Sequence, residues 1–182
     1  MVSGRVSFDP ALTTNADAFA LCAGRSFAAS DVVATIARPA GAPPRLDAAR
    51  GLEVAAFRAS DLAEIASLDV RLTGLDRRDD LQKAVRLVAR RRGALVGFLG
   101  ADGGQLGPAL ALDVADLGAL IARALVEIPG RAVARLSTAA PTAMLAALGL
   151  GFRVTSVGTL MVRGLSPPAR PPQLYSLVPE IF

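Results

Sequence analysis

Several residue types that carry catalytic chemistry are absent or scarce in this chain of 182 residues. Histidine is missing, tryptophan is missing, and Cys22 and Tyr175 are the only cysteine and the only tyrosine. Without histidine, a Ser-His-Asp triad and the common histidine zinc sites are excluded. A single cysteine can form neither an intrachain disulfide nor a cysteine metal cluster. We therefore expect no metal site and no histidine-based catalysis.

Long hydrophobic runs are also lacking, although apolar residues make up 52% of the chain. No stretch approaches the roughly 20 apolar residues of a membrane span, and the first ten residues contain no hydrophobic core of a secretory signal. The high apolar fraction excludes disorder throughout. We expect a cytoplasmic α/β protein without membrane contact, with one compact domain or one domain plus a fragment.

Lysine is nearly absent, because Lys83 is the only one, so arginine carries almost all of the basic charge. The formal net charge is +4, and the densest cluster contains Arg86, Arg90, Arg91 and Arg92. Such a surface can attract polyanions. Proteins that bind single-stranded nucleic acid also place aromatic side chains among the charges, and this stretch has none. Coding bias toward arginine is the simpler explanation, and nucleic-acid binding is the least favoured hypothesis.

Two segments of the chain, residues 4–39 and 130–164, resemble each other. Each begins with Gly-Arg and passes through a strand-like stretch and an alanine-rich helix to a phenylalanine, Phe27 or Phe152. Each then continues through an alternating segment to an arginine. The shared order favours descent from a duplicated unit over chance similarity of alanine-rich sequence. Residues 39–52, rich in proline and glycine, predict a linker.

Hydrophobic periodicity predicts ten elements in residues 53–164: a strand, two helices, three strands, and then helix, strand, helix and strand. Ser60 is a suitable N-cap for the first helix, and the second is expected at about 79–87. Asp113 is a suitable N-cap for the most strongly periodic helix. A strand at 132–137 should precede a helix that Pro141 opens and Gly149 ends. Residues 165–182 contain five prolines and predict an extended tail. This order fits a mixed sheet with helices on both faces.

The first segment carries the pattern Asn15-x-x-Ala18-x-x-Leu21-Cys22-x-x-x-Ser26-Phe27. It resembles the closing motif of the GNAT acetyltransferases, Asn-x-x-Ala-x-x-Leu-Tyr-x-x-x-Gly-Phe. The segments DLAEIASLD, GPALALD and GLGFRVTSVGTLMVRG, with the proline-rich ending, resemble the C-terminal module of tandem GNAT proteins. The resemblance implies a GNAT-like mixed twisted sheet flanked by helices. It also implies a strand-helix-strand remnant of a truncated first repeat at 1–38, a GNAT-like domain at 53–164 and a tail at 165–182.

The GNAT family uses acetyl-CoA and transfers the acetyl group to an amine. Its pantetheine arm hydrogen-bonds a strand that splays from its neighbour, and its pyrophosphate lies on an Arg/Gln-x-x-Gly-x-Gly/Ala loop at a helix start. Backbone N–H groups and the helix dipole make such a helix start an anion site. The resemblance therefore implies acetyl-CoA as cofactor. It makes five residues vestigial cofactor-binding candidates: Leu110, Ala111, Leu112, Val114 and Ala115.

The matching segment departs from the family pattern at the points that the chemistry needs. Asp113 and Asp116 replace the glycine-rich loop, and each carboxylate would repel a phosphate by roughly 4 kcal/mol at 4 Å and an effective dielectric constant of 20. The helix dipole contributes only about 0.3–1 kcal/mol in favour of an anion. The tyrosine that serves the family as general acid is replaced by Cys22 in the first segment and Ala147 in the second.

No catalytic residue is predicted from this pattern. Glu53, Glu64 and Glu127 are candidate bases, but each is explained more simply as a surface charge. We expect Cys22 to be a buried packing thiol. The leading hypothesis is a GNAT-like protein whose acetyl transfer to an unknown amine is weak or lost. The alternative is a non-catalytic binding or assembly module, in which a strand from residues 31–37 extends the sheet of the second domain or of a partner chain in a homo-oligomer.

Overall fold

The computed structural model describes residues 9–25, 28–44, 51–74, 76–128, 130–163 and 175–177. Ser26 and Phe27 of the closing motif, Pro129 after the periodic helix, and the prolines of the tail lie outside this part of the chain. The elements, in chain order, are β1 (Asp9–Thr13), α1 (Ala16–Ala23), β2 (Ala28–Arg38), β3 (Leu52–Ala56), α2 (Leu62–Thr73), α3 (Arg78–Ala84), β4 (Val85–Arg91), β5 (Ala94–Asp102), β6 (Gln105–Ala111), α4 (Val114–Glu127), β7 (Ala132–Ser137), α5 (Pro141–Gly149), β8 (Arg153–Arg163) and β9 (Tyr175–Leu177).

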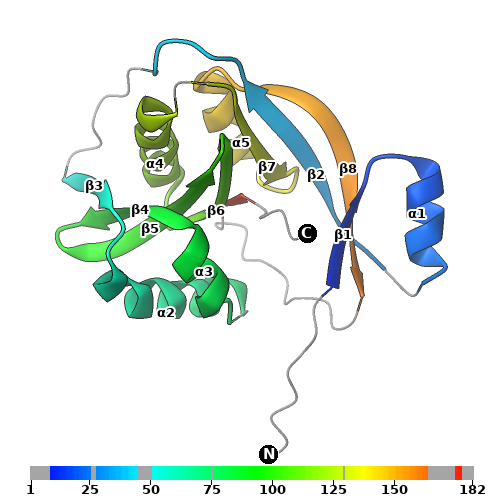
Figure 1. Ribbon diagram of the computed structural model, residues 1–182, viewed down its shortest axis with the longest axis horizontal. Helices are drawn as coiled ribbons and strands as arrows, with labels where there is room; N and C mark the ends of the chain where they lie inside the picture. Colours follow the sequence, from blue (N-terminus) through cyan, green and yellow to red (C-terminus); the bar gives the residue numbers. More distant parts are fainter. Residues whose placement is uncertain are drawn as a thin grey trace, which may run out of the picture.

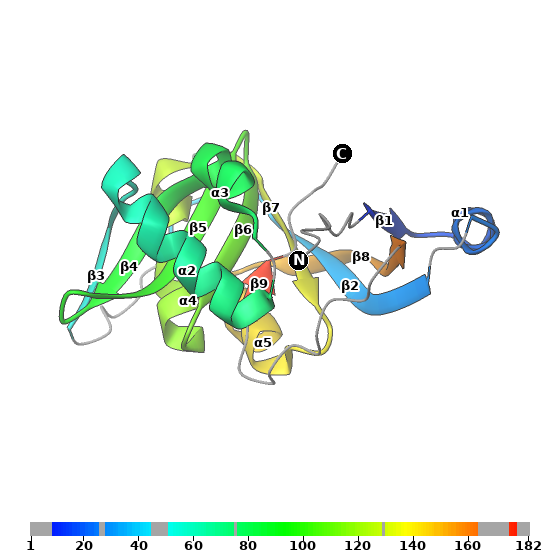
Figure 2. The same cartoon turned by 90° about the horizontal axis from the view of Figure 1, so that it is seen from below.

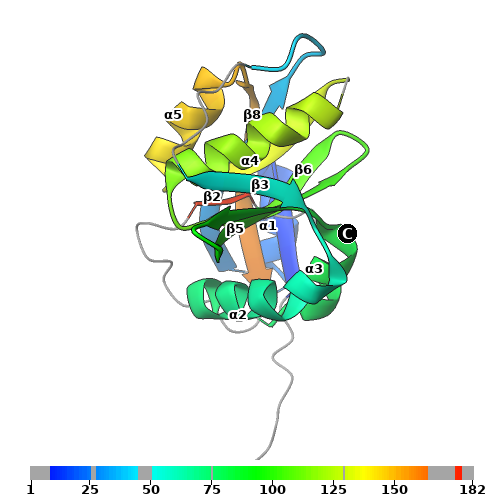
Figure 3. The same cartoon turned by 90° about the vertical axis from the view of Figure 1, so that its left-hand side faces the viewer.

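The described strands form one mixed sheet of nine strands in the order β1-β8-β2-β7-β9-β6-β5-β4-β3. Helices α2 and α3 cover one face of the sheet, and α4 and α5 cover the other (Figures 1 and 3). Each face has its own hydrophobic core. The larger core joins α4 and α5 to the sheet, and the smaller one lies beneath α2 and α3 around Ile65, Leu81 and Phe98. The expected α/β architecture with helices on both faces is confirmed.

The predicted order of elements between residues 53 and 164 is also observed, and the differences lie at their ends. Helix α5 and strand β7 have the predicted bounds. The helix expected at 79–87 ends at Ala84, because Val85, Leu87 and Val88 are all buried in β4 against β5. Because these residues are buried on both faces of the strand, they form an apolar run that periodicity alone cannot distinguish from a buried helix.

Helix α2 begins differently from the prediction. A single 3-10 turn at Ala59–Asp61 precedes it, and the side chain of Asp61, rather than that of Ser60, accepts a hydrogen bond from a backbone N–H, that of Arg58, at 2.8 Å. The side chain of Asp61 therefore closes the 3-10 turn, and α2 has no side-chain cap of its own, so the prediction of Ser60 as its N-cap is wrong. Tertiary contacts explain the choice, since Asp61 also reaches an arginine of β4.

Strand β2, from the N-terminal segment, lies within the sheet between β7 and β8 (Figure 1). It pairs antiparallel with both, with Ile36 opposite Ala134 on one side and Val154 on the other. Val33 and Ile36 are fully buried. The expectation that a strand near residues 31–37 extends the sheet of the following domain is confirmed. The division of the chain into a repeat remnant, linker, domain and tail stays a prediction.

The backbones of two neighbouring segments approach strand β5 closely at Gly100. A Cβ atom at this position would lie 2.7 Å from the carbonyl oxygen of Gly107 in β6 and 2.9 Å from that of Ala84. Such distances are shorter than van der Waals contact, so only glycine fits here. The close approach fixes the path of β6 towards the start of α4.

Candidate functional site

The parallel strands β6 and β7 pair over only two register positions, Gln105 with Val133 and Leu106 with Ala134. Beyond these positions, towards their carboxyl ends, the two strands separate and β9 lies between them (Figure 2). We call this space the β6–β7 gap. Because α4 follows β6 directly, the gap opens beside the N-terminus of α4.

Strand β9 runs antiparallel to both neighbours in this gap. Against β6 it pairs Leu177 with Ala109, Ser176 with Leu110, and Tyr175 with Ala111. Against β7 it pairs Leu177 with Leu136. The tail that the prolines led us to expect as merely extended thus contributes a strand to the centre of the sheet. Its sequence signal is weak, because LYSLV contains the strand-favouring residues Tyr and Val but shows no alternation of apolar and polar residues.

The start of α4 is capped by Asp113, as predicted. Its backbone is extended, with φ −131° and ψ 148°, and its side chain accepts a hydrogen bond from the N–H of Ala115 at 2.8 Å. The first four N–H groups of a helix have no partner inside the helix, and this carboxylate takes one of them. The Asp113 side chain is exposed at the helix start.

Asp116 lies differently from the expectation that both aspartates face the cleft. It is only 2% exposed and accepts a hydrogen bond from Nη2 of Arg91, in β4, at 2.6 Å. Asp116, Leu120 and Ala124 are four residues apart and share the buried face of α4. The carboxylate therefore packs towards the sheet and is neutralised by a guanidinium. Of the two charges predicted to repel a phosphate, only that of Asp113 lies exposed at the helix start.

The five cofactor-binding candidates occupy different positions around the gap. Leu110 and Ala111 are buried, and their backbone is paired with β9. The N–H of Leu112 donates to the carbonyl oxygen of Val96 at 2.9 Å. Leu112 and Ala115 are exposed, and Val114 is half-buried at the first position of α4. The candidates thus line one edge of the gap and the helix start, and β9 covers the backbone of two of them.

The two positions that correspond to the family's tyrosine lie apart. Ala147, in α5, is 1% exposed and belongs to the larger core. Cys22 is partly exposed, so the prediction of a buried thiol is wrong. The reason is the position of α1, which packs on β1 and β8 beyond the end of the sheet and leaves one side uncovered by described residues (Figure 1). Neither position brings a proton donor to the gap.

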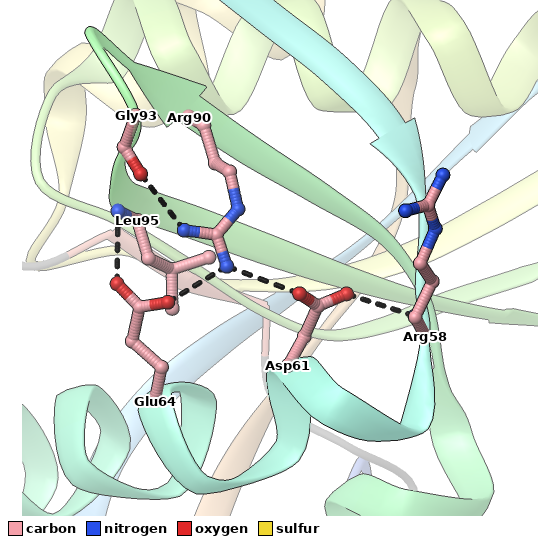
Figure 4. A network of polar contacts seen from close by, with 6 residues as sticks. All are labelled: Arg58, Asp61, Glu64, Arg90, Gly93 and Leu95. Atoms are coloured by element: carbon pink, nitrogen blue, oxygen red, sulfur yellow. Dashed lines mark hydrogen bonds and ion pairs between the residues drawn. The ribbon is translucent and has the colours of Figure 1, made fainter.

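A polar network ties α2 to the β4–β5 hairpin (Figure 4). Nη2 of Arg90 lies 3.0 Å from Oδ1 of Asp61 and 2.7 Å from Oε2 of Glu64, and Nη1 of Arg90 donates to the carbonyl oxygen of Gly93. The N–H of Leu95 donates to Oε1 of Glu64 at 3.2 Å. The network joins two segments that are distant in the sequence, residues 58–64 and 90–95.

This network also decides the role of Glu64. The hydrogen bond from Arg90 lowers the pKa of its carboxyl, and the same contact raises the pKa of the Arg90 guanidinium. A general base at neutral pH needs a pKa near the working pH, so Glu64 is a structural ion-pair partner. Glu127 pairs with Arg123 one helical turn away, and Glu53 is exposed on β3. The interpretation of all three glutamates as surface charges agrees with these positions.

The arginine cluster is largely engaged within the fold. Arg90 binds Asp61 and Glu64, Arg91 binds Asp116, and Arg86 donates to the backbone carbonyl oxygens of Lys83 and Val85. These contacts direct three guanidinium groups to the fold's own carboxylates and carbonyls. The cluster therefore has a structural explanation that the sequence alone did not supply.

Two further searches of the described residues concern metals and membranes. Among them, no group of three or more His, Cys, Asp or Glu side chains is placed to hold a metal ion. None of the described helices combines the length and the apolar character that a membrane crossing requires.

Comparison with solved structures identifies the fold. A proposed acetyltransferase from Pyrococcus horikoshii matches with a TM-score of 0.68 at 14% identity, covering 94% of this chain and 58% of its own. The GCN5-related N-acetyltransferase from Sphaerobacter thermophilus matches with a TM-score of 0.63 at 13% identity, covering 92% and 63%. A GNAT-family acetyltransferase from Colwellia psychrerythraea matches with a TM-score of 0.54 at 11% identity, covering 88% and 65%.

This chain has the GNAT acetyltransferase fold. At identities of 11–14%, the likeness concerns the fold and leaves activity open. The GNAT-like chain spans about three-fifths of the length of the first two structures. No protein-family model matches the sequence, and no curated protein matches it. Its position as the C-terminal module of a tandem GNAT protein stays a prediction.

Proposed function

We propose that this GNAT-fold chain is an acyl-CoA-binding protein whose affinity is low and whose acetyl transfer to an amine is weak or lost. The observation that supports binding is the β6–β7 gap beside the start of α4. An extended ligand arm with amide groups can pair with the backbone of β6, and a pyrophosphate can approach the unpaired N–H groups of the helix. The backbone of Leu110 and Ala111, with the helix start at Val114 and Ala115, would hold the cofactor.

The low affinity follows from two features of the same site. Asp113 occupies the N–H of Ala115 and places a negative charge at the helix start, where a pyrophosphate would otherwise gain from the dipole. Strand β9 already pairs with the backbone of β6. An acyl-CoA must therefore compete with two groups of the chain itself.

Weak transfer follows from the loss of the family's phenol at the position that Ala147 holds. In acetyl transfer the amine nitrogen attacks the acetyl carbonyl carbon, the C–S bond breaks, and the departing thiolate needs a proton. The position of the family's phenol is held by Ala147, which is buried and carries no proton to give. General acid catalysis contributes about 10²–10⁴ in rate, so we expect transfer to be slower by this factor than with a donor in place.

Calorimetry with coenzyme A and with acetyl-CoA tests the binding. We expect dissociation constants between about 0.1 and 10 mM, which correspond to roughly 3–5 kcal/mol of binding free energy. Release of free thiol from acetyl-CoA in the presence of a mixture of primary amines tests the transfer. Micromolar binding with rapid thiol release would contradict the weak-site proposal. The absence of any heat at 10 mM would contradict the binding proposal.

A second candidate function is a non-catalytic assembly module, which one feature of the sheet favours. Val32 of β2 and Val154 and Val157 of β8 are 45–51% exposed, and the register of the two strands places them on the same face. Exposed apolar side chains that lie together on a sheet often mark an interface. Light scattering after size exclusion tests it: a dimer that dissociates in a Val154→Asp, Val157→Asp variant supports assembly, and a monomer at all concentrations contradicts it.

A further inference from the structure

The β6–β7 gap is filled by an extended occupant. With β9 in place, Leu110, Ala111 and Leu136 flank the gap and are at most 1% exposed, so the backbone around them has little access to water. Buried N–H and C=O groups need partners. Strand β9 supplies them on both sides, pairing at three register positions with β6 and at one with β7.

The occupant that the structure holds is short. Strand β9 has three residues, whereas β5, on the other side of β6, has nine. A strand of three residues forms few backbone hydrogen bonds, and extended peptides are known to add to and leave exposed strand edges through such main-chain pairing. The edge of β6 therefore needs a pairing partner, and β9 is short enough to be exchanged for another one.

We infer that the β6–β7 gap is a strand-accepting groove and that β9 is its autoinhibitory occupant, which an acyl-CoA has to displace. The second half of this inference rests on the proposed function. The first half does not, because it follows from the pairing of β9 alone. Both claims concern the backbone of Ala109–Ala111, which cannot pair with β9 and with a pantetheine arm at the same time.

A double proline substitution in the full chain, Ser176→Pro with Leu177→Pro, tests the groove. Neighbouring residues of a strand direct their N–H groups to opposite sides, so two consecutive prolines remove a donor towards β6 and a donor towards β7. The control is Ser176→Ala with Leu177→Ala, which keeps both N–H groups. A circular dichroism melt establishes that each variant folds.

Binding of a peptide gives the first reading, which is independent of coenzyme A. A fluorescent peptide of residues 173–179, QLYSLVP, is titrated into each chain and followed by anisotropy. The proline variant should bind it at least tenfold more tightly than the unsubstituted chain and the alanine control. Equal affinity in all three chains, or no binding to a folded proline variant, would overturn the strand-accepting groove.

Binding of coenzyme A gives the second reading. The proline variant should bind it at least tenfold more tightly than the alanine control, and unlabelled peptide should reverse the gain. Equal affinity of the variant and the control would overturn autoinhibition. If the peptide binds the proline variant and coenzyme A binds none of the chains at 10 mM, the groove stands, and both the proposed function and the autoinhibitory role fail.

Hydrogen exchange in the unsubstituted chain covers the case in which the proline variant does not fold. Coenzyme A at 10 mM should raise the exchange rate of the amides of 175–177 at least tenfold and leave those of the β4–β5 hairpin unchanged. Unchanged exchange at 175–177, in a chain that calorimetry shows to bind coenzyme A, would overturn the inference.

Discussion

The substitution Asp113→Asn isolates the charge at the start of α4 from the other properties of the residue. Asparagine is as good an N-cap as aspartate, so the hydrogen bond to the N–H of Ala115 can be kept. What changes is one negative charge beside the helix start. The variant therefore asks whether this carboxylate is the barrier to an anionic ligand.

The expected magnitude follows from the exposure of Asp113. Because the side chain lies in solvent, a dielectric constant near that of water applies. Two unit charges about 6 Å apart then repel by about 0.7 kcal/mol. A pyrophosphate with two negative charges is therefore repelled by about 1.4 kcal/mol, which corresponds to about tenfold in the dissociation constant. Asp116 contributes little in comparison, since Arg91 neutralises it at 2.6 Å.

Calorimetry with coenzyme A at low salt and at about 0.5 M salt measures the effect, in the unsubstituted chain and in the β9 proline variant. We expect Asp113→Asn to bind about tenfold more tightly at low salt and the gain to shrink at high salt, where screening shortens the range of the charge. The matched control is Asp17→Asn, which removes an exposed charge from the first turn of α1. Equal affinities of the two variants, or a gain independent of salt, would refute the electrostatic reasoning.

Three further predictions concern stability, each measured by urea unfolding. Arg77→Ala leaves the fully buried Asp69 without its bidentate partner and should lower the free energy of unfolding by about 3–5 kcal/mol. Asp69→Ala leaves an arginine that can reach water and should lower it by less. Equal losses in the two variants would contradict this. The lowered pKa of Glu64 means that its ion pair stabilises the fold above the ordinary value of 4.5 and is lost as the pH falls through the lower folded value. The difference between the unsubstituted chain and Glu64→Gln should therefore stay below about 1 kcal/mol at neutral pH, because Glu64 is half exposed. It should shrink, not grow, as the pH falls below 4.5 and through the lowered pKa of the folded state. Gly100→Ala forces a Cβ to 2.7 Å from a carbonyl oxygen and should cost about 1–3 kcal/mol, whereas Gly118→Ala, with no atom within 4 Å of its Cβ, should gain up to about 1 kcal/mol.

The elements that the sequence predicted best have local signals at both ends. Helix α5 begins at a proline and ends at a glycine, and β7 lies between the Pro-Gly pair at 129–130 and the proline that opens α5. Helix α4 combines an N-cap at Asp113 with strict helical spacing of its apolar residues. Strand β4 was predicted less well, because its apolar run at 87–89 is buried on both faces and does not alternate.

The site was only partly accessible from the sequence. The resemblance pointed to β6 and the start of α4 as a cofactor site, which stays a prediction, and the observed N-cap at Asp113 followed from residue type. The direction of Asp116 had a signal that we did not use, because its spacing of four from Leu120 places it on the buried face of α4. Its partner Arg91, 25 residues earlier, could not be found in this way.

The sequence by itself determined the class of the fold and excluded histidine-based catalysis. Periodicity, caps and breakers are local properties, and the lack of histidine is a matter of composition, so both can be read without coordinates. The tertiary structure decided which charges meet and which strand fills the gap. Ion pairs such as Arg91–Asp116 and the pairing of 175–177 with β6 join residues 25 to more than 60 positions apart. A short strand has almost no propensity signal of its own. Residues 175–177 form a strand because β6 and β7 separate and leave buried backbone groups between them. Among the described residues, only 175–177 pair with these groups.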